Sequence, residues 1–193
     1  MKWRPLTERE RGVPVPVAGT FEQLIMPHLD AAYNLARWLM QDVTAAEDVV
    51  QDAVLRALTY FGSYKGGNAR AWFLRVVRNV AYGALAAQRR GGTTSLDDAG
   101  LTAEGNPFAM EIADPGDDPE VTLARSEGFV RLDQALAALP EELRECLVLH
   151  ELEEFSYKEV AHITDVPIGT VMSRLWRARQ ILMRSQDKEG TIL

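Results

Sequence analysis

Apolar residues recur every three or four positions along most of the chain, a spacing that predicts helices, and no strand-like alternation is visible. The first such run extends from Phe21 to Leu39 and is preceded by a capping box, in which Thr20 and Gln23 stand three residues apart. Pro27 lies inside this run, so we expect a kink or a separate short helix before the main one.

A second capping box, Thr44 with Glu47, predicts the start of the next helix. Its expected buried positions are Val49, Val50, Ala53, Val54, Ala57 and Leu58. The glycine-rich stretch 61–68 predicts a loop with two aromatic residues. Asn68 is placed to cap a further helix over residues 69–88, with Trp72, Phe73, Val76, Val77 and Val80 on its apolar surface.

Helical spacing resumes after a break, with one helix predicted over residues 129–139 and another from Pro140 to about Glu151. Proline is favoured at the first position of a helix because its missing N–H needs no partner there. Ser156 and Glu159 then form a third capping box, which predicts a helix beginning at Tyr157.

Pro167 ends that helix, and a second one is expected to begin near Ile168 or Gly169. Its apolar stripe is Val171, Leu175, Ala178 and Leu182. Its other faces carry no acidic residue and hold Ser173, Arg174, Trp176, Arg177, Arg179 and Arg184. Two short helices joined by a tight turn, the second of them basic, indicate a DNA-reading helix-turn-helix. The alternative is an ordinary helical hairpin with a solvated basic face.

The composition is that of an ordinary globular protein of one large or two small domains, with 193 residues, 47% hydrophobic and 25% charged. No apolar run approaches the roughly 18 residues of a membrane span. The N-terminus has no apolar segment typical of a secretory signal. One cysteine, Cys146, excludes an internal disulfide and suits a reducing cytosol, and we interpret it as core packing rather than as a redox sensor.

Charge is distributed unevenly around a net value of −7. Residues 65–90 contain six Lys or Arg and no acid, and residues 167–184 contain four Arg and no acid. Residues 91–128 contain nine acids and one Arg. Local charge governs attraction to phosphate, so two basic patches in an acidic chain predict weak binding to free DNA and a need for a larger partner.

Catalytic chemistry finds no support in the sequence. The three histidines, His28, His150 and His162, are dispersed, and no phosphate loop or nucleophile elbow occurs. Ligand spacing for zinc is absent, so we expect no metal site, no cofactor and no enzymatic activity.

Four motifs, in order, carry a resemblance to a known family. They are Ala46-Glu47-Asp48-Val49-Val50-Gln51-Asp52-Ala53-Val54-Leu55-Arg56-Ala57, Trp72-Phe73-Leu74-Arg75-Val76-Val77-Arg78-Asn79, Leu139-Pro140-Glu141-Glu142-Leu143-Arg144-Glu145-Cys146-Leu147-Val148-Leu149, and Ser156 through Arg179. In these residues the chain resembles the extracytoplasmic-function, or group IV, sigma factors of bacterial RNA polymerase.

The resemblance implies an all-α fold of two small helical domains joined by a flexible acidic linker. It divides the chain into a flexible leader, a sigma2-like domain, the linker, a sigma4-like helix-turn-helix domain and a tail, with the bounds 1–19, 20–90, 91–125, 126–186 and 187–193. It also implies an alternative sigma factor that directs promoter-specific initiation through −10 and −35 recognition.

Site roles follow from the same resemblance. Docking on the β′ coiled coil of polymerase would use Asp48, Gln51, Asp52 and Arg56. Recognition and melting of the −10 element would use Phe61, Tyr64, Lys65, Asn68, Arg70, Trp72, Arg75, Arg78 and Asn79. The alternative is that Trp72 and Tyr64 are core residues, an interpretation that the pattern favours for Trp72. Contact with the −35 element would use Thr170, Met172, Ser173, Arg174, Trp176, Arg177 and Arg179.

The implied partners are core polymerase, through its β′ coiled coil and β flap, promoter DNA, and an anti-sigma factor, in the cytoplasm and without membrane insertion. Two residues differ from the family pattern: Gly83 stands where an acid is usual, and Met172 where a base is usual. The alternative function is a free-standing helix-turn-helix regulator, which would be expected to dimerise on paired half-sites.

Overall fold

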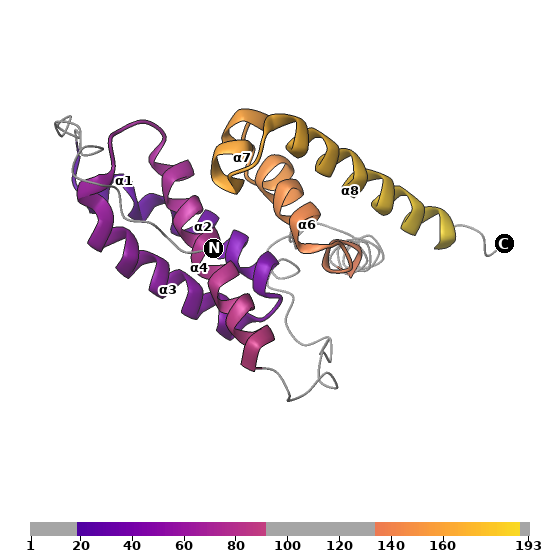
Figure 1. Ribbon diagram of the computed structural model, residues 1–193, viewed down its shortest axis with the longest axis horizontal. Coiled ribbons are helices and arrows are strands. Elements are labelled where there is room, and N and C mark those ends of the chain that lie inside the picture. The colour runs from indigo at the N-terminus through magenta and orange to yellow at the C-terminus, as the bar shows by residue number, and fades with distance from the viewer. Residues whose placement is uncertain (1–18, 92–133, 190–193) are drawn as a thin grey trace, which may run out of the picture. The chain divides into compact units, whose positions relative to one another are not determined.

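The computed structural model describes residues 19–91 and 134–189, and within these residues every regular element is a helix (Figure 1). The predicted all-α class is thereby confirmed. The α-helices are α1 (Phe21–Leu24), α2 (Leu29–Met40), α3 (Val43–Tyr60), α4 (Ala69–Gly91), α6 (Glu141–Leu147), α7 (Tyr157–Thr164) and α8 (Ile168–Glu189). Most of the predicted leader, linker and tail, and the first part of the predicted helix over 129–139, lie outside the described residues.

The first helical run is divided as the position of Pro27 predicts. Helix α1 begins with the expected capping box, in which Thr20 and Gln23 exchange hydrogen bonds between side chain and backbone. Pro27 then lies in a 3₁₀ turn, Met26–His28, before α2 begins. Helix α2 ends at Met40, and the next residue, Gln41, caps it in the left-handed conformation with φ of 56°.

Helix α3 begins one residue before the predicted capping box. Asp42 is its N-cap, and one of its carboxylate oxygens accepts a hydrogen bond of 2.6 Å from the Ala45 amide. The expected start at Thr44 and Glu47 was wrong, because aspartate two residues earlier caps the same first turn.

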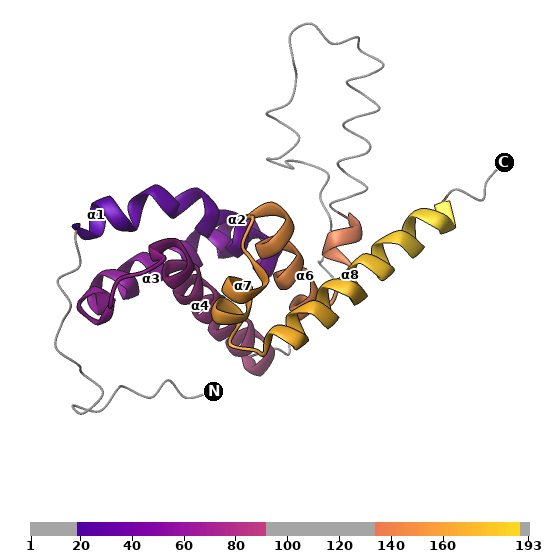
Figure 2. The ribbon, with the colours of Figure 1, turned by 90° about the horizontal axis from the view of Figure 1, so that it is seen from above.

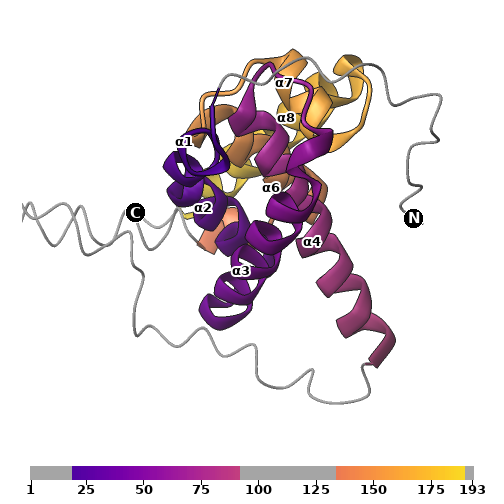
Figure 3. The same cartoon turned by 90° about the vertical axis from the view of Figure 1, so that its left-hand side faces the viewer.

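Small residues line the face of α3 that is buried. Ala46, Val49, Ala53 and Ala57 are spaced by three or four positions, which places them on one stripe. Their small side chains allow α2 and α3 to lie close together along their lengths (Figures 1 and 3). Leu58, expected to be buried, is instead 54% exposed.

Helix α4 begins at the predicted cap. The Asn68 side chain accepts a hydrogen bond of 3.1 Å from the Ala71 amide, and the helix continues to Gly91, three residues beyond the predicted end. Its buried positions are Ala71, Phe73, Leu74, Val77, Val80 and Ala81. Trp72 and Val76, predicted on the apolar surface, are only half-buried.

The C-terminal part contains a π-helical turn that the sequence pattern did not predict. Pro140 is the N-cap of α6 rather than its first residue, and Val148–Leu152 follows α6 directly in π geometry. The Glu153 amide donates to the Val148 carbonyl at 3.0 Å, and the Phe155 amide donates to the Leu149 carbonyl at 3.0 Å. Phe155 is thereby placed in the core, where it is buried.

Helices α7 and α8 form the predicted helix-turn-helix (Figure 2). The Glu159 carboxylate accepts a hydrogen bond of 3.0 Å from the Ser156 amide, and the Ser156 hydroxyl oxygen accepts one of 3.4 Å from the Glu159 amide, which confirms the capping box. Asp165 takes the left-handed conformation, with φ of 57°, between the two helices. The predicted stripe of α8 is buried at Val171, Leu175 and Ala178. Helix α8 packs this stripe against α6.

Arg144 is a buried charged residue with a structural role. Its guanidinium Nη1 donates to the carbonyl of Ala137 at 2.7 Å and to that of Leu139 at 3.1 Å. The Ala137 carbonyl is the last of the helical turn at residues 134–137, and the Leu139 carbonyl follows two residues later. The arginine of the third motif therefore caps the preceding helical turn. Cys146, in the same helix, is fully buried, in agreement with a packing role.

Replacing Arg144 with methionine is expected to lower the free energy of unfolding of the C-terminal part by about 3 kcal/mol. Methionine keeps much of the apolar stem, but the Ala137 and Leu139 carbonyls lose a charged donor. Hydrogen exchange of the α6 and α8 amides as a function of urea concentration measures the loss. Arg184→Met, at an exposed position of α8, is the control and should be nearly neutral. Equal stability of the two variants would contradict the capping role.

Candidate nucleic-acid interface

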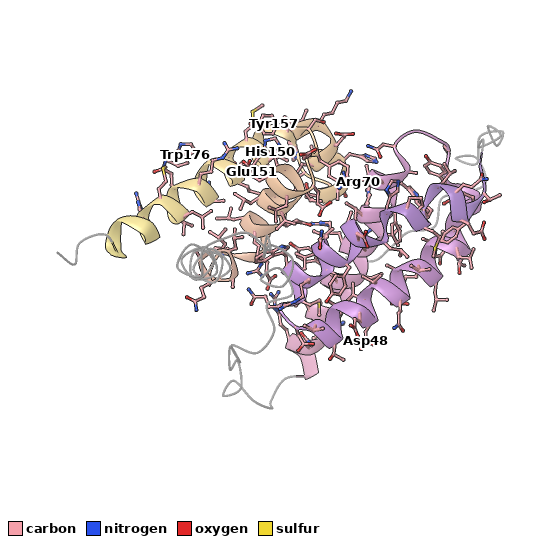
Figure 4. The ribbon with its side chains drawn as sticks, turned by 180° about the vertical axis from the view of Figure 1, so that it is seen from behind. Asp48, Arg70, His150, Glu151, Tyr157 and Trp176 are labelled. Carbon is pink, nitrogen blue, oxygen red and sulfur yellow. The ribbon has the colours of Figure 1, made fainter. Side chains whose placement is uncertain are left out.

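The exposed face of α8 presents a contiguous set of side chains. Met172 is 50% and Trp176 is 63% exposed, and Ser173 and Arg177 are also exposed. Successive residues of an α-helix are about 100° apart, so these four positions share one face, opposite the buried Val171 and its stripe. Figure 4 shows Trp176 projecting from α8.

Arg177 is the cation of this face that is available to a ligand. Among the residues that the structure describes, no acid forms an ion pair with it. The neighbouring Ser173 hydroxyl donates to the Thr170 carbonyl at 2.9 Å, which leaves the lone pairs of the hydroxyl oxygen as acceptors. Thr170 itself is half-buried in the first turn of α8.

The other two arginines predicted to contact DNA are already paired within the protein. Arg174 Nη2 lies 2.7 Å from a Glu142 carboxylate oxygen, and the Arg174 side chain is only 14% exposed. Arg179 donates from Nε at 3.2 Å and from Nη2 at 2.5 Å to one oxygen of Glu151. The hydrogen bonds that Arg179 donates to Glu151 are the largest cause that raises the pKa of Arg179. The sequence pattern could not predict these pairs, because their partners stand 32 and 28 residues away.

A second predicted surface, the loop between α3 and α4, is built on four aromatic rings. Phe61 lies 5.4 Å from Phe21, 6.0 Å from Tyr64 and 6.4 Å from Trp72, measured between ring centroids. Tyr64 and Trp72 are 5.4 Å apart. The cluster joins α1, the loop and α4, so it holds the loop against the helices on either side of it.

Tyr64 anchors the turn of this loop. Its side chain is 6% exposed, and its hydroxyl donates to the Gly67 carbonyl at 2.7 Å. Gly66 and Gly67 have φ values of +86° and +99°, a region that strongly favours glycine. Stacking of Tyr64 on a base stays a prediction and would require the ring to leave the cluster, whereas Trp72 is half-buried and Lys65 and Asn68 are exposed.

Tyr64→Phe is expected to loosen the loop while keeping the aromatic cluster. The variant loses only the hydroxyl bond to Gly67, which contributes about 1 kcal/mol. Native-state hydrogen exchange should therefore become about fivefold faster at the loop amides of residues 65–67. Tyr33→Phe, the same change on α2, should leave these rates unaltered. Unchanged loop exchange in Tyr64→Phe would show that the hydroxyl does not anchor the turn.

Basic side chains follow the loop along α4. Arg70, Arg75 and Arg78 are half-buried, and Asn79 is exposed. The Arg78 guanidinium lies over the ring of Tyr82, 4.5 Å from its centroid.

Burial, and secondarily the charge of Arg70, lowers the pKa of His28, so the His28 imidazole is held toward its neutral form.

The exposed face of α3 combines carboxylates with apolar side chains. Asp48 and Gln51 are exposed, and Asp52 pairs with Arg56 at 2.7 Å one turn further along the helix. Figure 4 shows Asp48 on this helix. Leu55, 63% exposed, and Leu58 lie on the same face. The sequence reasoning missed them, although an apolar residue on the polar side of an amphipathic helix is a readable signal of a partner surface.

No group of three or more His, Cys, Asp or Glu side chains is arranged to hold a metal ion in residues 19–91 and 134–189. In the same part of the chain, no helix has both the length and the apolar character needed to cross a bilayer.

Comparison with known proteins identifies families and relatives of similar sequence. The family model for sigma-70 region 2 matches residues 24–91, and that for sigma-70, region 4 matches residues 129–182. The chain is 31% identical to the RNA polymerase sigma-H factor of Pseudomonas aeruginosa over 165 residues, which cover 84% of this chain and 83% of that protein. It is 36% identical to the ECF RNA polymerase sigma-E factor of Escherichia coli over 138 residues, 70% of each chain.

Solved structures show the same fold. The sigma factor RpoE of Bartonella quintana, crystallised in complex with the anti-sigma factor NepR, superposes with a TM-score of 0.65 at 29% identity, covering 85% of this chain and 94% of that one. CnrH, in complex with the cytosolic domain of CnrY, superposes with a TM-score of 0.58 at 23% identity, covering 87% and 88%. The second likeness concerns the fold alone.

Proposed function

The chain belongs to the extracytoplasmic-function sigma factors of the sigma-70 family, non-enzymatic proteins that direct transcription initiation by RNA polymerase, and we propose that it does so through three separate surfaces. The exposed face of α8 reads the −35 element, the loop at residues 61–68 with α4 acts at the −10 element, and the exposed face of α3 docks on polymerase. The observation that carries this proposal is the α8 face of Met172, Ser173, Trp176 and Arg177, exposed on the second helix of a helix-turn-helix.

This α8 face has the chemistry of a major-groove reader. An α-helix fits the major groove, where arginine binds guanine through two hydrogen bonds and a serine hydroxyl can donate or accept. Apolar side chains contact the thymine methyl group, which suits Met172 and Trp176. Within residues 19–91 and 134–189, Arg177 has no ion pair that must break before it binds a base edge.

The α3 face suits a basic protein partner, which we assign to the β′ coiled coil of polymerase. Asp48, Gln51 and Asp52 offer acceptors for basic side chains, with Arg56 beside them. Leu55 and Leu58 add apolar area of the kind that contributes affinity at the centre of an interface. The helix-turn-helix part would meet the β flap.

The loop over residues 61–68 and the basic side of α4 suit a melted promoter strand at the −10 element. Extruding a base costs a few kcal/mol, which a pocket must recover through stacking and hydrogen bonds. Lys65 and Asn68 are exposed polar groups at this loop, and Arg75 and Asn79 follow on α4. The aromatic cluster beneath them keeps the loop in a fixed shape.

Control by an anti-sigma factor completes the proposal. The sigma factor RpoE of Bartonella quintana, which has a similar fold, was solved with such a partner bound. Because core polymerase and promoter DNA are cytoplasmic, we place the protein's activity in the cytoplasm.

Mixing the purified chain with core polymerase and with duplex DNA tests the proposal. On size-exclusion chromatography we expect co-elution with core polymerase and weak retention of DNA by the chain alone. A run-off transcription screen over the genome of origin should then yield transcripts that share a promoter motif. A dimer that binds DNA tightly without polymerase would favour a free-standing regulator instead.

A further inference from the structure

The arginines of α8 differ in their ion-pair partners. These arginines lie on or beside the surface proposed to bind DNA. Positions 172, 173, 176 and 177 occupy the centre of the exposed face. At about 100° per residue, Arg179 lies at one edge of that face and Arg174 at the opposite edge. The edges of a helix in the major groove face the two flanking phosphate backbones, so both arginines are at positions where phosphate contact is expected.

Each edge arginine already has a carboxylate partner, but the two pairs are not equivalent. The Arg174 side chain is 14% exposed and has a buried guanidinium nitrogen, so this arginine is largely sequestered, although its partner Glu142 is 65% exposed. Arg179 and Glu151 are 47% and 44% exposed, so solvent and ligands reach both members of this pair. Glu151 is therefore the carboxylate that a phosphate can replace as the partner of Arg179.

The backbone turn that carries Glu151 is fixed by contacts of its neighbours. Glu151 stands in the π-helical turn Val148–Leu152, next to His150. The His150 Nδ1 is 2.7 Å from the Phe155 carbonyl, and its ring lies 4.6 Å from the ring of Tyr157, between centroids. After Glu151, Tyr157 is a smaller cause that raises the pKa of Arg179. Figure 4 shows His150, Glu151 and Tyr157 together.

We propose that Glu151 competes with DNA phosphate for Arg179 and so sets the affinity of this protein for duplex DNA. The inference rests on the proposed function of α8. Two donors of Arg179 converge on one Glu151 oxygen, the arrangement that a phosphate oxygen would otherwise occupy. Contact with DNA at this edge requires that ion pair to break. The chain thus weakens its own sequence-independent binding and leaves recognition to the central face.

Glu151→Gln is the direct test, since glutamine keeps the shape and removes the charge. The probe is a short mixed-sequence DNA duplex, and the readout is fluorescence anisotropy of the full chain between about 50 and 200 mM salt. We expect affinity to rise about two- to fivefold, as for an exposed ion pair removed from competition. One additional phosphate contact should also make the slope of log K against log salt steeper by about 0.9.

Two controls separate this mechanism from a general charge effect. Glu154→Gln removes an exposed acid three residues further along the chain and should change affinity little. Adding Glu151→Gln to Arg179→Ala should give no gain, because the cation that Glu151 restrains is absent. A gain that persists without Arg179, or an equal gain in Glu154→Gln, would overturn the inference in favour of simple repulsion, and an unchanged Glu151→Gln would overturn it outright.

Arg177→Ala on the same probe distinguishes the failure of this inference from that of the proposed function. If Arg177→Ala weakens binding and Glu151→Gln has no effect, α8 binds DNA and the competition by Glu151 is wrong. If neither substitution alters binding, α8 is not the DNA-binding surface, and both proposals fall.

Discussion

Replacing Arg177 with alanine is expected to lower transcription from −35-dependent promoters by about tenfold to a hundredfold, which corresponds to the loss of one bidentate base contact. Arg177 lies at the centre of the exposed α8 face and has no internal ion pair in the described part of the chain. Its contacts with DNA therefore contribute to binding without the cost of breaking such a pair. Run-off transcription with purified core polymerase measures the effect.

Affinity for core polymerase should be the same in Arg177→Ala and in the wild type, because the α3 face is untouched. The matched variant Arg177→Lys retains the charge but not the planar pair of donors. It should therefore recover sequence-independent binding without recovering promoter selectivity. Weakened assembly of Arg177→Ala with core polymerase would contradict the assignment of α8 to DNA.

Asp52→Arg is expected to produce the opposite result, with about tenfold or greater loss of affinity for core polymerase. The substitution reverses the charge on the α3 face and sets two arginines, at 52 and 56, one turn apart where an ion pair now lies. Such a like-charge pair destabilises a helix by only a few tenths of a kcal/mol, so the fold should persist. Competition with labelled wild-type protein for a limiting amount of core polymerase measures the change.

Asp30→Arg is the control for this variant. Asp30 is exposed in the first turn of α2, so the same charge change is made away from the α3 face. It should compete as well as the wild type, and circular dichroism should show both variants folded. The docking assignment would have to be abandoned if Asp52→Arg and Asp30→Arg assembled equally well.

Local signals in the sequence were sufficient to predict much of this fold. The capping boxes at Thr20 and Ser156, the break at Pro27 and the cap at Asn68 each depend on residues within three or four positions of one another. The start of α3 was misplaced because Asp42 and Thr44 are both acceptable caps, and only the observed hydrogen bond distinguishes between them.

Other features depend on contacts between distant residues, which no local pattern contains. The carboxylates that hold Arg174 and Arg179 stand 32 and 28 residues before these arginines in the chain. The burial of Tyr64 follows from rings contributed by α1 and α4. Leu58 was assigned to the core from its spacing, yet the close approach of α2 along the small residues of α3 leaves it outside.

The π-helical turn constrains the number of residues between α6 and α7 more tightly than their identity. A one-residue deletion within Val148–Leu152 would allow this turn to relax into α geometry. Everything after it would rotate by about 100° about the helix axis, which would withdraw Phe155 from the core and turn Glu151 away from α8. Substitutions in this turn are therefore expected to disturb the packing of the C-terminal part less than insertions or deletions do.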